Sequence, residues 1–173
     1  MKKTTDEKVK NLNHESAVKK IQELVKDAQI CMFTTDLLQA PFSTRPMSAQ
    51  ETDEDGNLWF FSSKLSKKNN EITLNPYVQL FFSNKSSAEF LSIYGQAQIV
   101  YDRKKIEELW NPLVKVWFPE GKDDPNIALI KVTPQHSYYW DTQHNKMVAL
   151  VKMVASLVTG VTMDDGVEGT LHV

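Results

Sequence analysis

The sequence predicts a small β-barrel with added helices, in the α+β class. About six or seven short runs rich in β-branched and aromatic residues are separated by turn signals, and helix-like segments interrupt them at irregular intervals. Because strands and helices do not alternate regularly, we do not expect a doubly wound parallel sheet. The length of 173 residues suits one domain with a sizeable core.

An amphipathic helix opens the predicted domain. Residues 1–10 are polar and charged, so we expect a disordered N-terminal arm over residues 1–12 and a single domain over residues 13–173. Asn13 is a suitable N-cap for a helix that runs to Ala28. Its apolar residues lie at helical spacing on one face: Val18, Ile21, Leu24, Val25 and Ala28.

A strand, a β-hairpin and a short helix are expected next. The polar segment 51–57 contains Gly56 and separates two strand-like runs, which is typical of a hairpin. Ser66 is a suitable N-cap for the short helix, and Asn75-Pro76 would end it. The expected ranges are Ile30–Thr35 for the first strand, Ser43–Gln50 and Asn57–Ser63 for the hairpin, and Ser66–Leu74 for the helix.

The rest of the chain is predicted to hold further strands and short helical segments. Gly95 stands inside a predicted strand, where a glycine often marks a bulge or a close approach. Asp102 is expected to cap a helix through Trp110, followed by a short helical piece over residues 111–117. Strands are expected at Tyr77–Ser83, Phe90–Tyr101, Ile127–Val132 and Ser137–Trp140, and an apolar helix at Lys146–Thr159.

Composition restricts the class of protein. The formal net charge of −2 argues against nonspecific nucleic-acid binding. Cys31 is the only cysteine, so no intrachain disulfide forms and the chain suits a reducing cytosol. Residues 1–10 contain no apolar signal-peptide region, and the apolar stretch 147–158 is too short to span a bilayer. We therefore expect a cytoplasmic protein with neither nucleic acid nor membrane as a partner.

Cationic and hydroxyl side chains gather at the predicted hairpin. Arg45 lies in its first strand, and the second strand ends in Ser62 and Ser63, followed by three lysines just before a helix. Folding the hairpin would bring Arg45 across from the start of this cluster. A guanidinium, hydroxyls, ammonium groups and a helix N-terminus together are typical of a phosphate site. Only two of the 20 basic side chains are arginines, which favours a use for the planar fork of Arg45.

Other interpretations of these residues stay open. A strand end rich in serine and lysine is often only a solvated edge, where lysine discourages aggregation. The chain contains neither the glycine fingerprint of a dinucleotide fold nor a Walker lysine motif, so any nucleotide is held by another kind of cradle. Its four histidines show no ligand spacing, and we expect no metal site.

An ordered set of short motifs extends from the Asn13 helix to about Asp141. They are Arg45-Pro46-Met47, Trp59-Phe60-Phe61-Ser62-Ser63, Ser66-Lys67-Lys68, Trp110-x-Pro112, Trp117-Phe118-Pro119-x-Gly121 with Asp123-Asp124-Pro125, and Tyr139-Trp140-Asp141. In this set the chain resembles the pyridoxamine phosphate oxidase-like flavoproteins, and within them the general stress protein branch. The resemblance implies an FMN-binding split β-barrel of about six antiparallel strands and a homodimer with the flavin at the subunit interface.

The resemblance also implies cofactor-binding positions, while no catalytic residue is identified. The phosphate of FMN would be bound by Arg45, Ser66, Lys67 and Lys68. The ribityl chain and one ring edge would lie along Phe61, Ser62 and Ser63, and the pyrimidine side of the ring near Met47 and Gln50, with Pro46 in the same motif. From the second subunit, the ring could be reached by Tyr94, Trp110 or Trp140. FMN is the expected cofactor, and FAD, a deazaflavin or another flavin stays open.

One departure from the family pattern bears on the reaction. The resemblance suggests that authentic pyridoxamine phosphate oxidases carry a lysine at the position of Gln50 and basic residues, including arginine, after the tryptophan of the last strand. Here Trp140 is followed by Asp-Thr-Gln-His-Asn-Lys-Met. We therefore do not expect synthesis of pyridoxal phosphate.

Two functions follow from the resemblance. The first is an FMN-dependent oxidoreductase that acts on a small molecule with NAD(P)H as electron partner. The alternative is a non-enzymatic flavin-binding stress protein that serves as a buffer, sensor or carrier. A barrel that binds nucleic acid through Lys64, Lys67 and Lys68 is the remotest reading.

Overall fold

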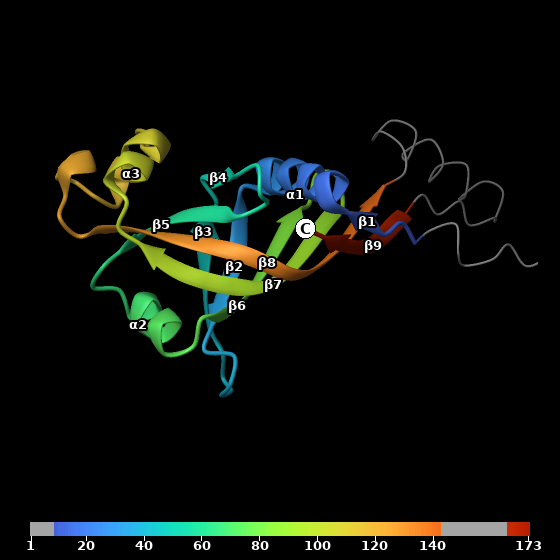
Figure 1. Cartoon of the computed structure of the whole chain (residues 1–173), viewed down its shortest axis with the longest axis horizontal. Coiled ribbons are helices and arrows are strands. Elements are labelled where there is room, and N and C mark those ends of the chain that lie inside the picture. The colour runs from blue at the N-terminus through green and yellow to red at the C-terminus, as the bar shows by residue number, and fades with distance from the viewer. Residues whose placement is uncertain (1–8, 143–165) are drawn as a thin grey trace, which may run out of the picture.

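The computed structural model describes residues 9–142 and 166–173, and one curled sheet dominates this part of the chain (Figure 1). Its strands are β1 (Leu12–Asn13), β2 (Ile30–Thr35), β3 (Ser43–Ser48), β4 (Glu51–Thr52), β5 (Leu58–Ser63), β6 (Tyr77–Asn84), β7 (Glu89–Val100), β8 (Ile127–Thr142) and β9 (Gly166–His172). The helices are α1 (His14–Ala28), α2 (Lys67–Leu74) and α3 (Arg103–Leu109), with short 3₁₀ turns at Val114–Val116 and Gly121–Asp123. The predicted α+β class is confirmed.

The sheet runs in the order β1-β9-β8-β7-β6-β2-β3, and β5 pairs with β8 off this path. Its neighbouring strands are antiparallel except for the short parallel pair of β1 and β9. The long strand β8 changes neighbours along its length: residues 127–132 pair with β5 and residues 137–142 pair with β9. Figure 1 shows it as the orange strand that extends from the α3 side to β9.

Helix α1 covers the main core. Its predicted amphipathic face is confirmed, since Ile21, Leu24 and Val25 are buried against the sheet together with residues such as Phe33 and Leu80. Asn13 occupies the predicted N-cap position, but its side chain makes no capping bond. Burying this face stabilises the helix by about 1.5–3 kcal/mol for each large apolar side chain.

A second, smaller core supports the other end of β5 and β8. It contains Trp59, Ile106, Val114, Phe118, Ile127 and Leu129. The predicted cap of α3 is confirmed, because the Asp102 carboxylate accepts a hydrogen bond from the backbone of Lys105. The short helical piece predicted over residues 111–117 is present as a 3₁₀ helix at Val114–Val116. Asn111 precedes it and accepts a hydrogen bond from the Leu113 backbone at 3.1 Å.

The predicted hairpin is wrong in its pairing. Strand β3 pairs along its whole length with β2, and only Glu51 and Thr52 pair with β5. At Ala49 and Gln50 the chain changes partner: Ala49 N–H donates to the Gln29 carbonyl, and Gln50 N–H donates to the Trp59 carbonyl. Arg45 is therefore opposite Phe33 and not opposite the hydroxyl cluster.

The two final strands predicted for the chain are one continuous strand. The pairing of β7 with β8 shifts between Tyr94, which is opposite His136, and Gly95, which is opposite Pro134. With this shift at Gly95, β8 continues past Pro134 as one strand. A Cβ atom on Gly95 would stand 2.5 Å from the Thr133 carbonyl oxygen, so the expected close approach is confirmed and comes from the neighbouring backbone.

Three short strands, β1, β4 and β9, were not expected from the sequence, and β4 lies at the start of the segment 51–57 that was predicted to be a turn. Strand β9 pairs with the second half of β8, and β1 takes up Leu12, the last residue of the predicted arm, opposite Leu171. Residues 9–11 of the predicted arm also lie against β9, where the Lys10 backbone N–H donates to the Glu168 carbonyl at 2.7 Å, so the predicted disorder is wrong for this part. Residues 1–8 lie outside the described residues, and the division into domains stays a prediction. The apolar segment Lys146–Thr159 lies outside the described residues. Among the described residues, no helix is long and apolar enough to cross a membrane.

Candidate functional site

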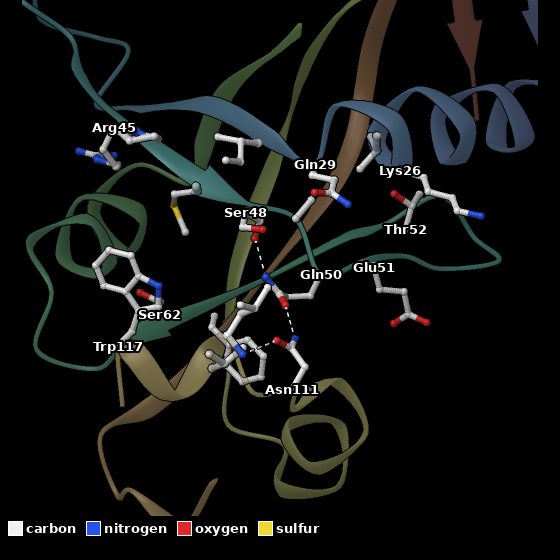
Figure 2. A pocket seen from close by; sticks show the side chains of 18 of the residues that line it. Lys26, Gln29, Arg45, Ser48, Gln50, Glu51, Thr52, Ser62, Asn111 and Trp117 are labelled. Carbon is white, nitrogen blue, oxygen red and sulfur yellow. Dashed lines mark hydrogen bonds between the residues drawn. The ribbon is translucent and has the colours of Figure 1, made fainter. Parts of the chain in front are cut away.

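A cavity of about 1010 Å³ lies beside the edge of the sheet (Figure 2). This volume is at the upper end of the range for small-molecule pockets. The walls come from the end of α1, strand β3 with β4, the end of β5, the start of α2, and segment 111–118. The lining residues are Gln22, Val25, Lys26, Gln29, Ile30, Arg45, Pro46, Met47, Ser48, Ala49, Gln50, Glu51, Thr52, Phe61, Ser62, Ser63, Lys68, Asn111, Leu113, Val114, Trp117 and Phe118.

Strand β3 offers backbone groups to the cavity, because it is the last strand of the main sheet path in the described chain. Ala49 N–H donates to the Gln29 carbonyl at 2.9 Å, and this bond fixes which residues of β3 point their backbone groups toward β2, since they alternate along the antiparallel ladder. In this alternation, the N–H of Ser48 and the carbonyl of Pro46 point away from β2. A backbone donor and a backbone acceptor thus stand side by side at the edge that borders the cavity.

Arg45 is held firmly at one end of the cavity. Its guanidinium donates to Thr35 Oγ1 at 2.6 Å, to Ser43 Oγ at 2.5 Å and to Glu71 Oε2 at 3.0 Å. These three bonds use only part of the five N–H groups of the fork. No side chain in the described part of the chain accepts from the remaining donors, so a ligand can.

Glu71 is the carboxylate that orients Arg45. Burial alone would raise the pKa of Glu71, but hydrogen bonds from Thr35, Ser43 and Lys67, with the nearby Arg45 charge, lower the pKa to about 2. The Lys67 ammonium lies 3.3 Å from its other oxygen and is itself mostly exposed. Glu71 thus stays ionised and fixes the guanidinium from behind.

Lys68 is a cation without a partner carboxylate in the described part of the chain. It is half-buried and lines the cavity. Burial lowers the pKa of its ammonium, and the positive charge of Arg45 lowers that pKa further. Arg45, Lys67 and Lys68 together face one carboxylate, Glu71, so the cluster carries excess positive charge. An anion bound between Arg45 and Lys68 would relieve their repulsion.

Hydroxyl groups and the start of α2 complete this end of the cavity. Ser62 Oγ donates to Asn69 Oδ1 at 2.7 Å and lies 3.2 Å from Ser66 Oγ. Ser66 occupies the predicted N-cap position but makes no capping bond, and the first turn of α2 contains no acidic residue. The first N–H groups of an α-helix have no acceptor within the helix, so they favour an anion.

An amide pair lies in the middle of the cavity. Gln50 Nε2 donates to the Ser48 carbonyl at 3.0 Å, and Gln50 Oε1 accepts from Asn111 Nδ2 at 2.9 Å (Figure 2). These bonds fix the Gln50 side chain and leave one of its N–H donors unused.

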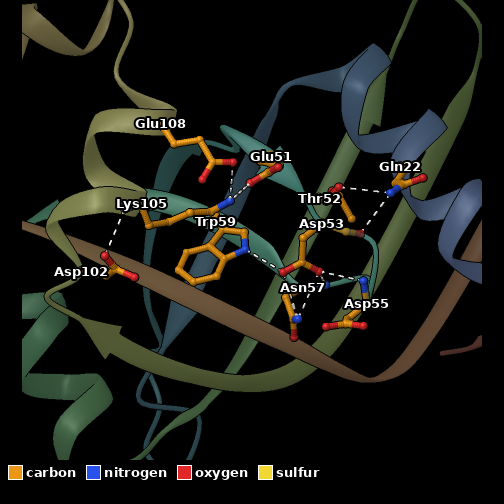
Figure 3. Close-up of polar contacts among 10 residues, drawn as sticks. All are labelled: Gln22, Glu51, Thr52, Asp53, Asp55, Asn57, Trp59, Asp102, Lys105 and Glu108. Atoms are coloured by element: carbon orange, nitrogen blue, oxygen red, sulfur yellow. Dashed lines mark hydrogen bonds and ion pairs between the residues drawn. The ribbon is translucent and has the colours of Figure 1, made fainter.

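A polar network holds the wall formed by β4 (Figure 3). Lys105 Nζ lies 2.5 Å from Glu51 Oε2 and 5.3 Å from the centre of the Trp59 ring. Burial alone would raise the pKa of Asp53, but hydrogen bonds from Trp59 and Asn57 lower it. The Trp59 indole donates to Asp53 at 2.9 Å. Glu51 is thereby neutralised by Lys105 and is not a free base.

The comparisons with known proteins identify the family of this chain. Residues 16–164 match the family described as "Pyridoxamine 5′-phosphate oxidase like". The chain belongs to this pyridoxamine 5′-phosphate oxidase-like family. The family named from the sequence motifs is therefore confirmed.

Individual members of the pyridoxamine 5′-phosphate oxidase-like family differ considerably in sequence from this chain. Protein bli-3 of Neurospora crassa is 25% identical over 138 residues, which is 75% of this chain and 66% of that protein, just under two thirds. The crystal structure of a general stress FMN/FAD binding protein from Xanthomonas citri is 31% identical with a TM-score of 0.62, over 72% of this chain and 87% of that one. A Jannaschia sp. CCS1 structure described as general stress protein 26 shares the fold, with a TM-score of 0.77 at 22% identity over 91% and 99% of the two chains.

Most site residues predicted from the family motifs lie together. The cavity is lined by Arg45, Pro46, Met47, Gln50, Phe61, Ser62, Ser63 and Lys68. Ser66 and Lys67 lie next to it without lining it. Trp110 supports the wall from outside, with its ring centre 5.9 Å from that of Phe61.

Two predicted residues lie on strands that do not line the cavity, Tyr94 on β7 and Trp140 on β8. Tyr94 stacks on Tyr77, with ring centres 5.7 Å apart, and Trp140 contacts Tyr138 at 4.8 Å. Neither lines the cavity of its own chain. Their role as partner-subunit contacts stays a prediction.

Several lining residues were not predicted, because they come from segments distant in sequence. The end of α1 contributes Gln22, Lys26 and Gln29, and the 3₁₀ segment contributes Asn111 and Trp117. Two family motifs, Trp110-x-Pro112 and Trp117-Phe118-Pro119, were the sequence signals for the second segment. Gln29 has a φ of 61°, which is unusual for a residue with a side chain, but a sequence does not show this.

Proposed function

We propose that the protein binds FMN in this cavity, with the phosphate between Arg45 and Lys68. The observation that carries the proposal is the half-buried ammonium of Lys68, which has no partner carboxylate among the described residues and lies beside a fixed guanidinium. A phosphate dianion supplies the missing negative charge, and charge-assisted hydrogen bonds contribute about 1.5–3 kcal/mol each. The Xanthomonas citri relative, an FMN/FAD binding protein by name, supports a flavin.

The middle of the cavity suits the flavin ring. The pyrimidine edge of isoalloxazine carries acceptors and an N–H donor, which complement the Ser48 N–H, the Pro46 carbonyl and the spare Gln50 N–H. Phe61, Met47 and Val114 supply apolar surface. The residues present therefore fit a phosphorylated flavin.

We propose an oxidoreductase of small molecules, with NAD(P)H as electron donor. When bound, the flavin supplies hydride and electron transfer. The protein would hold the phosphate, orient the ring through Gln50 and shield one side of it. Of the described residues that line the cavity, none is His, Cys or Asp, and Glu51 is paired with Lys105. No acid or base is thus assigned, and a non-enzymatic flavin carrier is the alternative.

The reaction proposed is not that of a pyridoxamine phosphate oxidase. A second phosphate in the cavity would need its own cations, and Arg45 and Lys68 are assigned to FMN. At the other end of the cavity, the only lining cation in the described chain is Lys26.

We also propose that a second copy of the chain covers an exposed apolar sheet face. This face includes Ile30, Met32, Phe81, Phe90 and Trp140, which are exposed, and the Tyr94–Tyr77 stack. Ile30 belongs both to this face and to the cavity lining. A partner on this face would therefore border the flavin site.

Purification and titration test the proposal. We expect the protein to carry flavin absorbance or to acquire it with micromolar FMN at one equivalent per chain, and mass spectrometry of the released ligand distinguishes FMN from FAD and deazaflavins. Steady oxidation of NADH or NADPH with an artificial acceptor would support the enzyme, and bound FMN without turnover would support the carrier. A flat FMN titration contradicts both. Pyridoxamine phosphate should give no more aldehyde than free FMN does.

A further inference from the structure

Trp117 is held out of the protein by two buried neighbours in its own segment. Val114 and Phe118 are both buried in the smaller core, and the backbone N–H of Trp117 donates to the Val114 carbonyl at 3.0 Å. Asn111 links the same segment to Gln50 across the cavity. The turn is thus anchored on both sides of the tryptophan.

The Trp117 indole is 79% exposed, the highest value among the chain's tryptophans. In the described part of the chain it makes no ring contact and no side-chain hydrogen bond. Trp110, by contrast, packs edge-on against Phe61. Keeping so large an apolar group in water is unfavourable, so the exposed ring indicates a missing contact.

The cavity itself indicates what this contact is. Trp117 lines it together with Arg45 and Lys68, and Figure 2 shows Trp117 beside Ser62, with Arg45 on the same side of the view. A ligand with its phosphate at the cations would place its ring system within the same cavity. A planar aromatic ring matches an indole better than an aliphatic substrate does.

We propose that Trp117 stacks on the isoalloxazine ring and sets the affinity for the flavin ring as distinct from its phosphate. This inference rests on the proposed function. Stacking of an aromatic side chain on a heteroaromatic ring contributes about 1–3 kcal/mol, which corresponds to roughly 5- to 150-fold in dissociation constant. Because the contact is to the ring, FMN and riboflavin lose the same factor when it is removed.

The test uses the full chain and three variants, with FMN and riboflavin as probes. Trp117→Leu should weaken both ligands by about the same factor, on the order of tenfold. It should also raise the fluorescence of bound FMN, since a stacked indole quenches flavin emission. Trp117→Phe should restore part of the affinity. Val116→Ala is the matched control: Val116 is 74% exposed in the same turn and does not line the cavity.

Three results would overturn the proposal. The first is a Trp117→Leu variant with wild-type affinity and wild-type flavin fluorescence. The second is a loss for FMN alone, which would place Trp117 at the phosphate. The third is unchanged flavin binding with a changed sedimentation coefficient, which would assign Trp117 to a subunit contact. If the wild-type protein binds neither ligand, the proposed function itself fails, and the wild-type titration alone shows this.

Discussion

The proposed phosphate site depends most directly on Lys68. Its neighbour Lys67 carries the same charge but is paired with Glu71 and does not line the cavity. The two lysines therefore form a natural comparison within one helix.

Lys68→Ala should weaken FMN by roughly 10- to 150-fold and leave riboflavin nearly unchanged, because only FMN carries the dianion. Fluorescence titration of both ligands measures this. Lys67→Ala should have a smaller effect. Equal losses for FMN and riboflavin in Lys68→Ala would remove Lys68 from the phosphate site.

Glu71 gives the ligand-free protein a pH dependence. Its pKa is about 2 in the folded chain against an ordinary value of 4.5. A carboxylate with a lowered folded pKa stabilises the fold above its unfolded pKa, and this contribution is lost as the pH falls from about 5 towards 2. The loss is on the order of 2–3 kcal/mol.

Glu71→Gln should therefore reduce the difference in unfolding free energy between pH 6 and pH 3. Urea denaturation of both proteins at a series of pH values checks this. Parallel curves for wild type and variant over this range would show that Glu71 is not the titrating group.

At the scale of elements, local patterns predict α1, β2 and β6 well, because each buries one face at a regular spacing along its own residues. The turn predicted over residues 51–57 is confirmed for residues 53–57, while Glu51 and Thr52 form β4. The Asp53 carboxylate holds this turn by accepting from the Asp55 and Asn57 backbone. The pairing of β3 was not predicted. Strand β3 pairs with β2, and the chain changes partner to β5 only after Ala49. A polar turn in the sequence does not specify which strand β3 pairs with.

In the candidate site, too, the contiguous residues were predicted and the residues from distant segments were not. The hydroxyl and lysine cluster at 62–68 is contiguous and could be read from the sequence. Asn111 and Trp117 reach the cavity only because Val114 and Phe118 pack into the smaller core. Such convergence of distant segments has no local signature.

Gly95→Ala should destabilise the β7–β8 ladder. The new Cβ would meet the Thr133 carbonyl oxygen, which belongs to the backbone and cannot turn aside. We expect a loss of about 1–3 kcal/mol or more in unfolding free energy. Ser92→Ala, in the same strand, is the control. Wild-type stability in thermal and urea denaturation would contradict the close approach.

For the whole molecule, the exposed apolar sheet face carries the proposal of a homodimer. Single exposed apolar side chains are normal, but a contiguous apolar patch across β2, β6, β7 and β8 favours a partner. Sedimentation at micromolar concentration should give twice the chain mass of 19.8 kDa. Phe81→Glu, near the middle of this face, should yield monomers. A wild-type monomer that still binds flavin tightly would contradict the shared interface.

The change of neighbours along β8 has a consequence for how the molecule opens. Its first half forms a ladder with β5, which borders the cavity, and its second half forms one with β9. Because both ladders share one strand, we expect them to open together, so that their amide hydrogens exchange with solvent as a single cooperative unit. Adding FMN should therefore slow hydrogen–deuterium exchange in residues 166–172 as well as in β5. Slowing confined to β5 would instead mean that β8 breaks near Pro134 into two independent units.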